Sequence, residues 1–133
     1  MILLSGDAGI GKTRLAEELC AWVARQGNAV AAAHCYPAGG GAVAYAPVVE
    51  WLRAPDLRAR LTALDDVWLG EVARILPLLL TDRPHIKPPG PLTEAWQRTR
   101  LFEALARAVL GPDDRAPLLL FLDDLQWCDQ ETL

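Results

Sequence analysis

One stretch decides the fold: Gly6-Asp7-Ala8-Gly9-Ile10-Gly11-Lys12-Thr13. It reads glycine, four free positions, glycine, lysine and threonine. Four apolar residues, Met1–Leu4, precede it and predict a short buried strand. After Lys12, apolar residues recur at helical spacing, at Leu15, Leu19, Trp22 and Val23. A strand, a glycine-rich turn and an amphipathic helix in this order begin a parallel α/β sheet.

The residue types of this stretch suit phosphate binding. Glycines allow positive φ and let successive backbone N–H groups face an anion. The helix that follows adds unpaired N–H groups and the positive end of its dipole. We therefore predict a P-loop at Gly6–Thr13, which binds a nucleoside triphosphate. The expected nucleotide contacts come from Gly6, Asp7, Ala8, Gly9, Ile10, Gly11, Lys12, Thr13 and the next residue, Arg14.

Two residues of the P-loop have further expected roles. Lys12 should reach the β- and γ-phosphates and serve catalysis as well as binding. The Thr13 hydroxyl should ligate Mg²⁺. Lysine is scarce in this chain, since Lys12 and Lys87 are the only two. The presence of one of them at the lysine position of the motif is therefore stronger evidence for a P-loop than it would be in a lysine-rich chain.

A second polar element follows a strand near the end of the sequence. Leu118–Leu122 is wholly apolar and predicts a buried parallel strand, closed by Asp123-Asp124. Asp123 is predicted to hold Mg²⁺, which prefers oxygen ligands. Asp124 is predicted to orient or deprotonate an attacking water. Two aspartates after a strand are often a turn or a helix cap, so the pair gains meaning only beside the P-loop.

The remaining elements are expected between these two motifs. Ala29–Cys35 is small and apolar and predicts another buried strand. Helices are expected over residues 47–53, 55–64, 67–76 with Asp66 as cap, and 94–110 with Thr93 as cap. The proline-rich residues 81–91 predict an irregular connector.

Composition limits the class of protein. The 133 residues suffice for one domain, and 52% hydrophobic with 23% charged residues indicate a globular core. A net charge of −4 argues against direct contact with nucleic acid or an anionic membrane. Cys20, Cys35 and Cys128 are odd in number and far apart, which favours neither a disulfide framework nor a metal knuckle. We therefore expect reduced, cytoplasmic conditions.

Other conspicuous residues have ordinary interpretations. His34 and His85 have no partners at metal-ligand spacing. The five tryptophans are interpreted as core and interface bulk. Tyr45 and Gly39–Gly41 could border the nucleotide or form a plain surface loop.

Several strings together resemble a known family. They are the P-loop with Arg14-Leu15, His34-Cys35-Tyr36, Tyr45-Ala46-Pro47, and Leu122-Asp123-Asp124-Leu125-Gln126-Trp127-Cys128-Asp129. The combination resembles the AAA-type ATPase domain of the STAND class, as found in large LuxR-type transcription regulators and beside some nucleotide cyclases. Residues 48–92 match that family only in helical character.

The resemblance implies a three-layer α/β P-loop NTPase with a parallel sheet and strands at residues 1–5, 29–35 and 118–122. It implies ATP as the nucleotide, Mg²⁺ as cofactor, slow hydrolysis and a conformational switch. In that family a strand with a sensor residue lies between the first and the last of these strands. Residues 1–133 would then be a partial domain that lacks the sensor strand and the C-terminal regions. The family also implies self-association through ATPase domains and a DNA-binding domain elsewhere in the full-length protein.

Two other functions stay open at this point. A small-molecule kinase also uses a P-loop, but it calls for a lid with paired arginines, and the adjacent Asp123 and Asp124 favour water as acceptor. The other is a module that binds nucleotide without turnover.

Overall fold

The computed structural model describes residues 1–37, 44–87, 89–111 and 117–132. Two strands, β1 (Ala29–His34) and β2 (Leu118–Asp123), form a parallel sheet. The helices are α1 (Lys12–Arg25), α2 (Ala46–Arg53), α3 (Pro55–Thr62), α4 (Asp66–Val72), α5 (Leu79–Asp82) and α6 (Ala95–Leu110), and a 3-10 turn, η1, spans Leu125–Trp127. In the described residues, no helix is long and apolar enough to cross a membrane.

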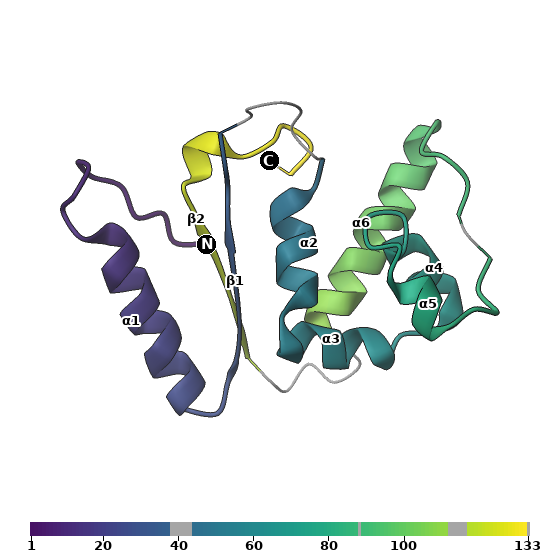
Figure 1. Cartoon of the computed structure of the whole chain (residues 1–133), viewed down its shortest axis with the longest axis horizontal. Coiled ribbons are helices and arrows are strands. Elements are labelled where there is room, and N and C mark those ends of the chain that lie inside the picture. The colour runs from purple at the N-terminus through teal and green to yellow at the C-terminus, as the bar shows by residue number, and fades with distance from the viewer. Residues whose placement is uncertain (38–43, 88, 112–116, 133) are drawn as a thin grey trace.

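The elements are arranged in layers around the sheet. Figure 1 shows α1 on one side of the two strands and α2 on the other. The helices α3 to α6 lie beyond α2 and form what we call the helical lobe. Parallel strands need a crossover connection, and here the crossover contains α2 and the whole helical lobe. The arrangement agrees with the α/β class predicted from the sequence.

The register of the two strands places polar residues at one end of the sheet. Ala29 lies opposite Leu118, and His34 lies opposite Asp123. The pairing extends by one bond, since the backbone N–H of Cys35 donates to the carbonyl of Asp123 at 3.1 Å. The carboxyl ends of both strands therefore meet at the same edge, which is where open α/β sheets bind ligands.

Carboxylates from the neighbouring helices protect the outer edge of β1. The N–H of Val30 donates to Asp56 of α3 at 3.1 Å, and the N–H of His34 donates to Glu50 of α2 at 3.0 Å. Unpaired strand edges recruit other chains, and acidic side chains on the edge oppose this. The bond at His34 also fixes the end of β1, next to Cys35.

The main core lies between α2 and the helical lobe rather than on the sheet. Its buried residues are Leu52, Leu61, Leu69, Val72, Ala73, Leu76, Leu79, Ala104 and Ala108. Next to this core a buried carboxylate, Glu71, pairs with Arg74 at 2.6 Å and with Arg100 at 3.2 Å. A buried charge is tolerated only when it is paired, so these contacts hold α4 against α6.

The segment Met1–Leu4 is not the buried strand that its sequence predicts. All four residues are exposed, with Leu4 at 47%, and within the described residues they make no backbone hydrogen bond to either strand. A strand exists only through its partner, because its N–H and C=O groups cannot bond within the segment. Four apolar residues give a local preference, but they do not supply that partner.

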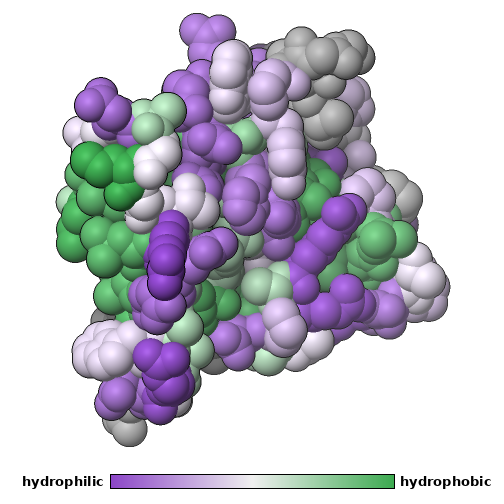
Figure 2. Space-filling model, turned by 60° about the vertical axis from the view of Figure 1, so that its left-hand side comes forward, coloured by the Kyte–Doolittle hydropathy of each residue, from purple (hydrophilic) through white to green (hydrophobic). Residues whose placement is uncertain are grey.

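Helix α1 forms as predicted, but most of its apolar stripe is uncovered. Leu15, Leu19 and Trp22 are exposed, and only Val23 of the predicted stripe is partly buried. A sheet of two strands is too narrow to cover the stripe. Figure 2 shows hydrophobic side chains gathered in a patch on one side of the molecule. Large apolar side chains on both α1 and Met1–Leu4 are exposed.

Two predicted helix caps were wrong by one residue. Asp65, not Asp66, is the N-cap of α4, and Asp66 instead pairs with Arg83 at 2.6 Å and His85 at 2.7 Å. The Arg83 and His85 contacts lower the pKa of Asp66. Glu94, not Thr93, caps α6 through a capping box with Gln97.

Two other predicted boundaries differ from those in the structure. Helix α4 stops at Val72, although the pattern predicts a helix to residue 76. The connector at residues 81–91 begins inside α5.

The tryptophans are less buried than predicted. Trp22, Trp96 and Trp127 are all at least half exposed. Trp51 does have a structural role, because its indole N–H donates to the carbonyl of Phe121 at 2.7 Å and so holds α2 on β2.

Truncation of the core should show how far stability depends on the contact between α2 and the lobe. Leu52 is 1% exposed, so Leu52→Ala should lower the free energy of unfolding by about 2–5 kcal/mol. Leu78→Ala removes the same atoms from an exposed side chain and should change it by less than about 0.5 kcal/mol. Urea unfolding followed by circular dichroism measures both. Equal effects of the two substitutions would contradict this location of the core.

Candidate functional site

The glycine loop has the backbone that phosphate binding requires. Gly9 and Gly11 have φ of 80° and 100°, a conformation that residues with a side chain rarely adopt. Helix α1 begins at Lys12, with Gly11 as its N-cap. The N–H of Leu15 donates to the carbonyl of Gly11 at 3.0 Å. The N–H groups ahead of Leu15 thus belong to the end of the helix that attracts anions.

Lys12 lies over this loop. Its ammonium group donates to the carbonyls of Gly6 and Asp7, each at 2.8 Å. Both bonds fold the side chain back onto the loop rather than into solvent. The positive charge is therefore held at the loop backbone, and phosphate oxygens are acceptors that it can take in place of the carbonyls.

One hydrogen bond joins the P-loop to the acidic pair. The Thr13 hydroxyl donates to Oδ2 of Asp123 at 2.9 Å, although 110 residues separate them. The other oxygen, Oδ1, accepts the backbone N–H of Asp124 at 2.9 Å. A hydroxyl and a carboxylate oxygen side by side are the hard ligands that Mg²⁺ prefers, and it needs few of them from protein when phosphates supply the rest. The residues present fit Mg²⁺.

Asp124 has an unusual backbone and an exposed side chain. Its φ and ψ are 55° and 43°, which is left-handed backbone on a residue other than glycine. Its Oδ1 accepts a hydrogen bond from the amide of Gln126 at 2.9 Å. The turn therefore presents an exposed and oriented carboxylate next to the strand end, and such a group can accept a proton from a water.

The chain after the acidic pair is fastened to the start of α2. Asp129 accepts the backbone N–H of Tyr45 at 3.2 Å, and it also accepts the N–H and the hydroxyl of Thr132. The Tyr45 ring is 7% exposed and meets Phe102 edge to face, with centroids 6.4 Å apart. Tyr45 is thus a packing residue at the start of α2. Gly39–Gly41 lie outside the described residues.

Two thiols lie near the acidic turn. Cys35 is buried just after β1, and Cys128 is partly buried just after η1. Burial raises the pKa of the Cys35 thiol to about 12, and the neighbouring Cys128, Asp129 and Asp124 add to the effect. The third cysteine, Cys20, is partly buried in α1, as its packing role predicts.

The remaining predicted residues take simpler positions. Asp7, Ala8 and Ile10 lie in the exposed part of the P-loop, and Arg14 is exposed on the first turn of α1. His34 lies beside Glu50, with Nδ1 and Oε1 3.8 Å apart. Among the described residues, no three His, Cys, Asp or Glu side chains are grouped to hold a metal by themselves.

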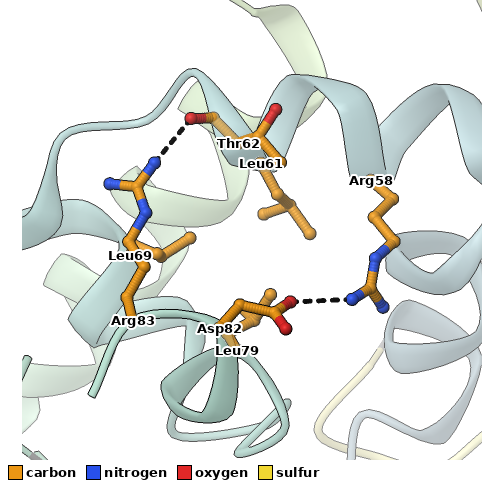
Figure 3. Close-up of a pocket in the computed structure, with 7 residues that line it drawn as sticks. All are labelled: Arg58, Leu61, Thr62, Leu69, Leu79, Asp82 and Arg83. Atoms are coloured by element: carbon orange, nitrogen blue, oxygen red, sulfur yellow. Dashed lines mark hydrogen bonds and ion pairs between the residues drawn. The ribbon is translucent and has the colours of Figure 1, made fainter.

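A small cavity in the helical lobe lies apart from these residues. Figure 3 shows its lining, which comes from Arg58, Leu61, Thr62, Leu69, Leu79, Asp82 and Arg83. Its volume of about 30 Å³ leaves room for only roughly two or three waters. Both arginines are engaged, Arg58 with Asp82 at 2.8 Å and Arg83 with the Thr62 carbonyl at 2.6 Å. This cavity is too small and too well paired to be a ligand site.

Sequence reasoning gave no roles to several residues that shape the site. Glu50, Gln126 and Asp129 orient the strand end, the acidic turn and the chain behind it. No local sequence pattern marks Glu50 as a site residue, because its partner is a backbone group of another element. Gln126 and Asp129 stand within the string quoted for the resemblance, so that string was the available signal.

The sequence matches a known protein family along its whole length. A family described as AAA ATPase domain matches the chain over residues 1–133. No curated protein and no solved structure matched the chain. The family match spans the P-loop, both strands and the acidic pair, and it supports ATP binding on an α/β P-loop fold, as predicted. The chain belongs to the AAA ATPase domain family.

Proposed function

We propose that this chain binds ATP with Mg²⁺ at Gly6–Thr13 and hydrolyses it slowly, as the switch module of a signal-transducing transcription regulator of the STAND class. The observation that supports it most is the 2.9 Å bond between Thr13 and Asp123. It brings together the two motifs on which phosphoryl transfer to water depends. The resemblance of the Asp123–Asp129 string supports the narrower STAND assignment, and the free thiols are compatible with a cytoplasmic location.

The proposed chemistry divides the work among the residues of the site. The glycine loop and the Lys12 ammonium bind and orient the phosphates, with the nucleotide contacts at Gly6–Thr13 and Arg14. Thr13 and Asp123 would hold Mg²⁺, which neutralises charge on the β- and γ-phosphates. Asp124 accepts the proton of the attacking water, and Gln126 keeps its carboxylate oriented. The resemblance also leads us to propose that such domains self-associate, while the acidic net charge leaves DNA contact to another domain.

The acceptor of the phosphoryl group separates this proposal from a kinase, because the adjacent Asp123 and Asp124 favour water as the acceptor. Transfer to water needs one base near the γ-phosphate, and Asp124 is exposed for that role. A binding module without turnover would need only the loop and Lys12. Release of phosphate from ATP by the purified chain distinguishes turnover from binding alone.

The first expected outcome concerns the lysine. Lys12→Ala removes a charge-assisted contact worth about 1.5–3 kcal/mol, so ATP affinity should fall roughly tenfold to a hundredfold. Titration with a fluorescent ATP analogue measures it. Lys87→Ala is the matched control, because Lys87 is the only other lysine and is exposed in the connector. Unchanged ATP affinity in Lys12→Ala would contradict the assignment of Gly6–Thr13 as a P-loop.

The second expected outcome separates the two carboxylates. Asp124→Asn should slow phosphate release while ATP still binds, because only activation of water is lost. Asp123→Asn should weaken binding in Mg²⁺ but change it little in EDTA, because the lost group is a metal ligand.

Asp65→Asn serves as the control for both variants, since Asp65 is exposed and makes no side-chain cap bond. Phosphate release and analogue titration are run on all three variants. Wild-type turnover in both Asp123→Asn and Asp124→Asn would show that the roles are assigned wrongly.

A further inference from the structure

Among the described residues, Asp124 and Tyr45 are the two other than glycine that have a left-handed backbone. Asp124 has φ of 55° directly after β2, and Tyr45 has φ of 63° at the N-cap of α2. A side chain makes this conformation costly, so it persists only where the surroundings hold it, and such residues cluster at functional and switch regions. The conformation of Asp124 belongs to the proposed site, but that of Tyr45 has no role in the proposed chemistry.

Three contacts hold Tyr45 in this conformation. Its N–H donates to Oδ1 of Asp129 at 3.2 Å, and its carbonyl accepts the N–H of Val49 at 2.9 Å as α2 begins. Its buried ring packs edge to face on Phe102 of α6. The bond to Asp129 is the one of the three that comes from the segment after the acidic pair. Loss of this bond would leave the strained backbone without its link to the site.

Asp129 is itself fixed to the segment that carries it. Its Oδ1 also accepts the N–H of Thr132 at 2.9 Å, and its Oδ2 accepts the Thr132 hydroxyl at 2.7 Å. Two donors from its own segment leave the carboxylate little freedom to rotate. The acceptor for the N–H of Tyr45 therefore moves only when the whole segment after η1 moves.

The other end of the same segment begins at the carboxylate that is proposed to hold Mg²⁺. Oδ2 of Asp123 accepts the Thr13 hydroxyl, and Oδ1 accepts the N–H of Asp124. The carbonyl of Asp124 then accepts the N–H of Trp127 at 2.8 Å, which closes η1. Both oxygens of Asp123 are thus in use. A ligand that takes one of them acts on the group that holds the first residue of the turn.

The rest of α2 is attached to the sheet by bonds that do not involve the turn. The indole of Trp51 donates to the carbonyl of Phe121, and Glu50 accepts the N–H of His34. A movement of the turn therefore acts on the first turn of α2 and not on the helix as a whole.

We propose that the bond from the N–H of Tyr45 to Asp129 is a latch through which an occupied nucleotide site fixes the first turn of α2. Tyr45 is the two-state element, because its left-handed backbone is held while Asp129 is in place and relaxes when Asp129 moves away. The latch rests on the proposed function, since it needs Mg²⁺ and ATP at the site. It adds the regulation of that site, because by linkage a change that frees the start of α2 weakens ATP binding by the same factor.

Hydrogen exchange of single amides, followed by NMR on the whole chain, tests the latch. Exchange is compared in Mg²⁺ alone and in Mg²⁺ with a non-hydrolysable ATP analogue. Val49 is the reporter, because its N–H bonds to the carbonyl of Tyr45 and remains in every variant. With the analogue, we expect the amides of the glycine loop and of Val49 to exchange more slowly. The expected slowing at Val49 is roughly fivefold or more, which is the low end of the usual coupling between sites.

Three variants separate the latch from the general stability of the segment. Asp129→Ala should abolish the response of Val49 and leave the response of the glycine loop. Asp129→Asn keeps an oxygen that accepts the N–H of Tyr45, so it should keep the response of Val49. Thr132→Val is the matched control, because it removes a hydroxyl bond to Asp129 but not the bond to Tyr45, and it should also respond. Circular dichroism checks that each variant is folded.

Two kinds of negative result are distinguishable. An undiminished Val49 response in Asp129→Ala, or an equal loss in Thr132→Val, would overturn the latch. A wild type whose glycine loop responds while Val49 does not would overturn it as well, and this comparison needs no variant. A wild type in which neither region responds would instead contradict nucleotide binding, and the latch would be rejected with it.

Discussion

The hydrogen bond from Thr13 to Asp123 is the constraint on which the site depends. Thr13 stands at the second position of α1, and Asp123 is the last residue of β2, so the bond forms only when the helix lies along the sheet with its first turn at the carboxyl edge. The parallel register then adds the strand end of β1 to the same place. The acidic turn begins at that same edge, directly after Asp123.

Local chemistry explains what could be predicted from the sequence. The P-loop, α1 and both β1 and β2 follow from short-range signals, because the glycine spacing, the helical period and the two apolar runs each specify their own conformation. The contact between Thr13 and Asp123 agrees with the sequence prediction that both residues ligate one metal, and the carboxyl ends of parallel strands converge at one edge. Lys12 lies over the glycine loop, and its contact with the phosphates stays a prediction.

Non-local pairing explains what could not be predicted. Met1–Leu4 has the composition of a strand, but strand formation depends on a partner that four residues do not specify. The stripe of Leu15, Leu19 and Trp22 has a helical period, but the period does not say what covers it. The bond from the N–H of His34 to Glu50 belongs to the same class, because it joins elements whose relation is set by the whole fold.

The turn after the acidic pair links the site to the rest of the molecule. Within a few residues, Asp124 is oriented by Gln126, and Asp129 is bonded to the N–H of Tyr45 at the start of α2. The Tyr45 ring packs against Phe102 of α6, and Leu52 of α2 is part of the main core. Any displacement of the turn would therefore strain the bond between Asp129 and the start of α2. A bound metal would take the Asp123 oxygen that accepts the Thr13 hydroxyl, and the Asp129 bond joins the chain just after that turn to the start of α2.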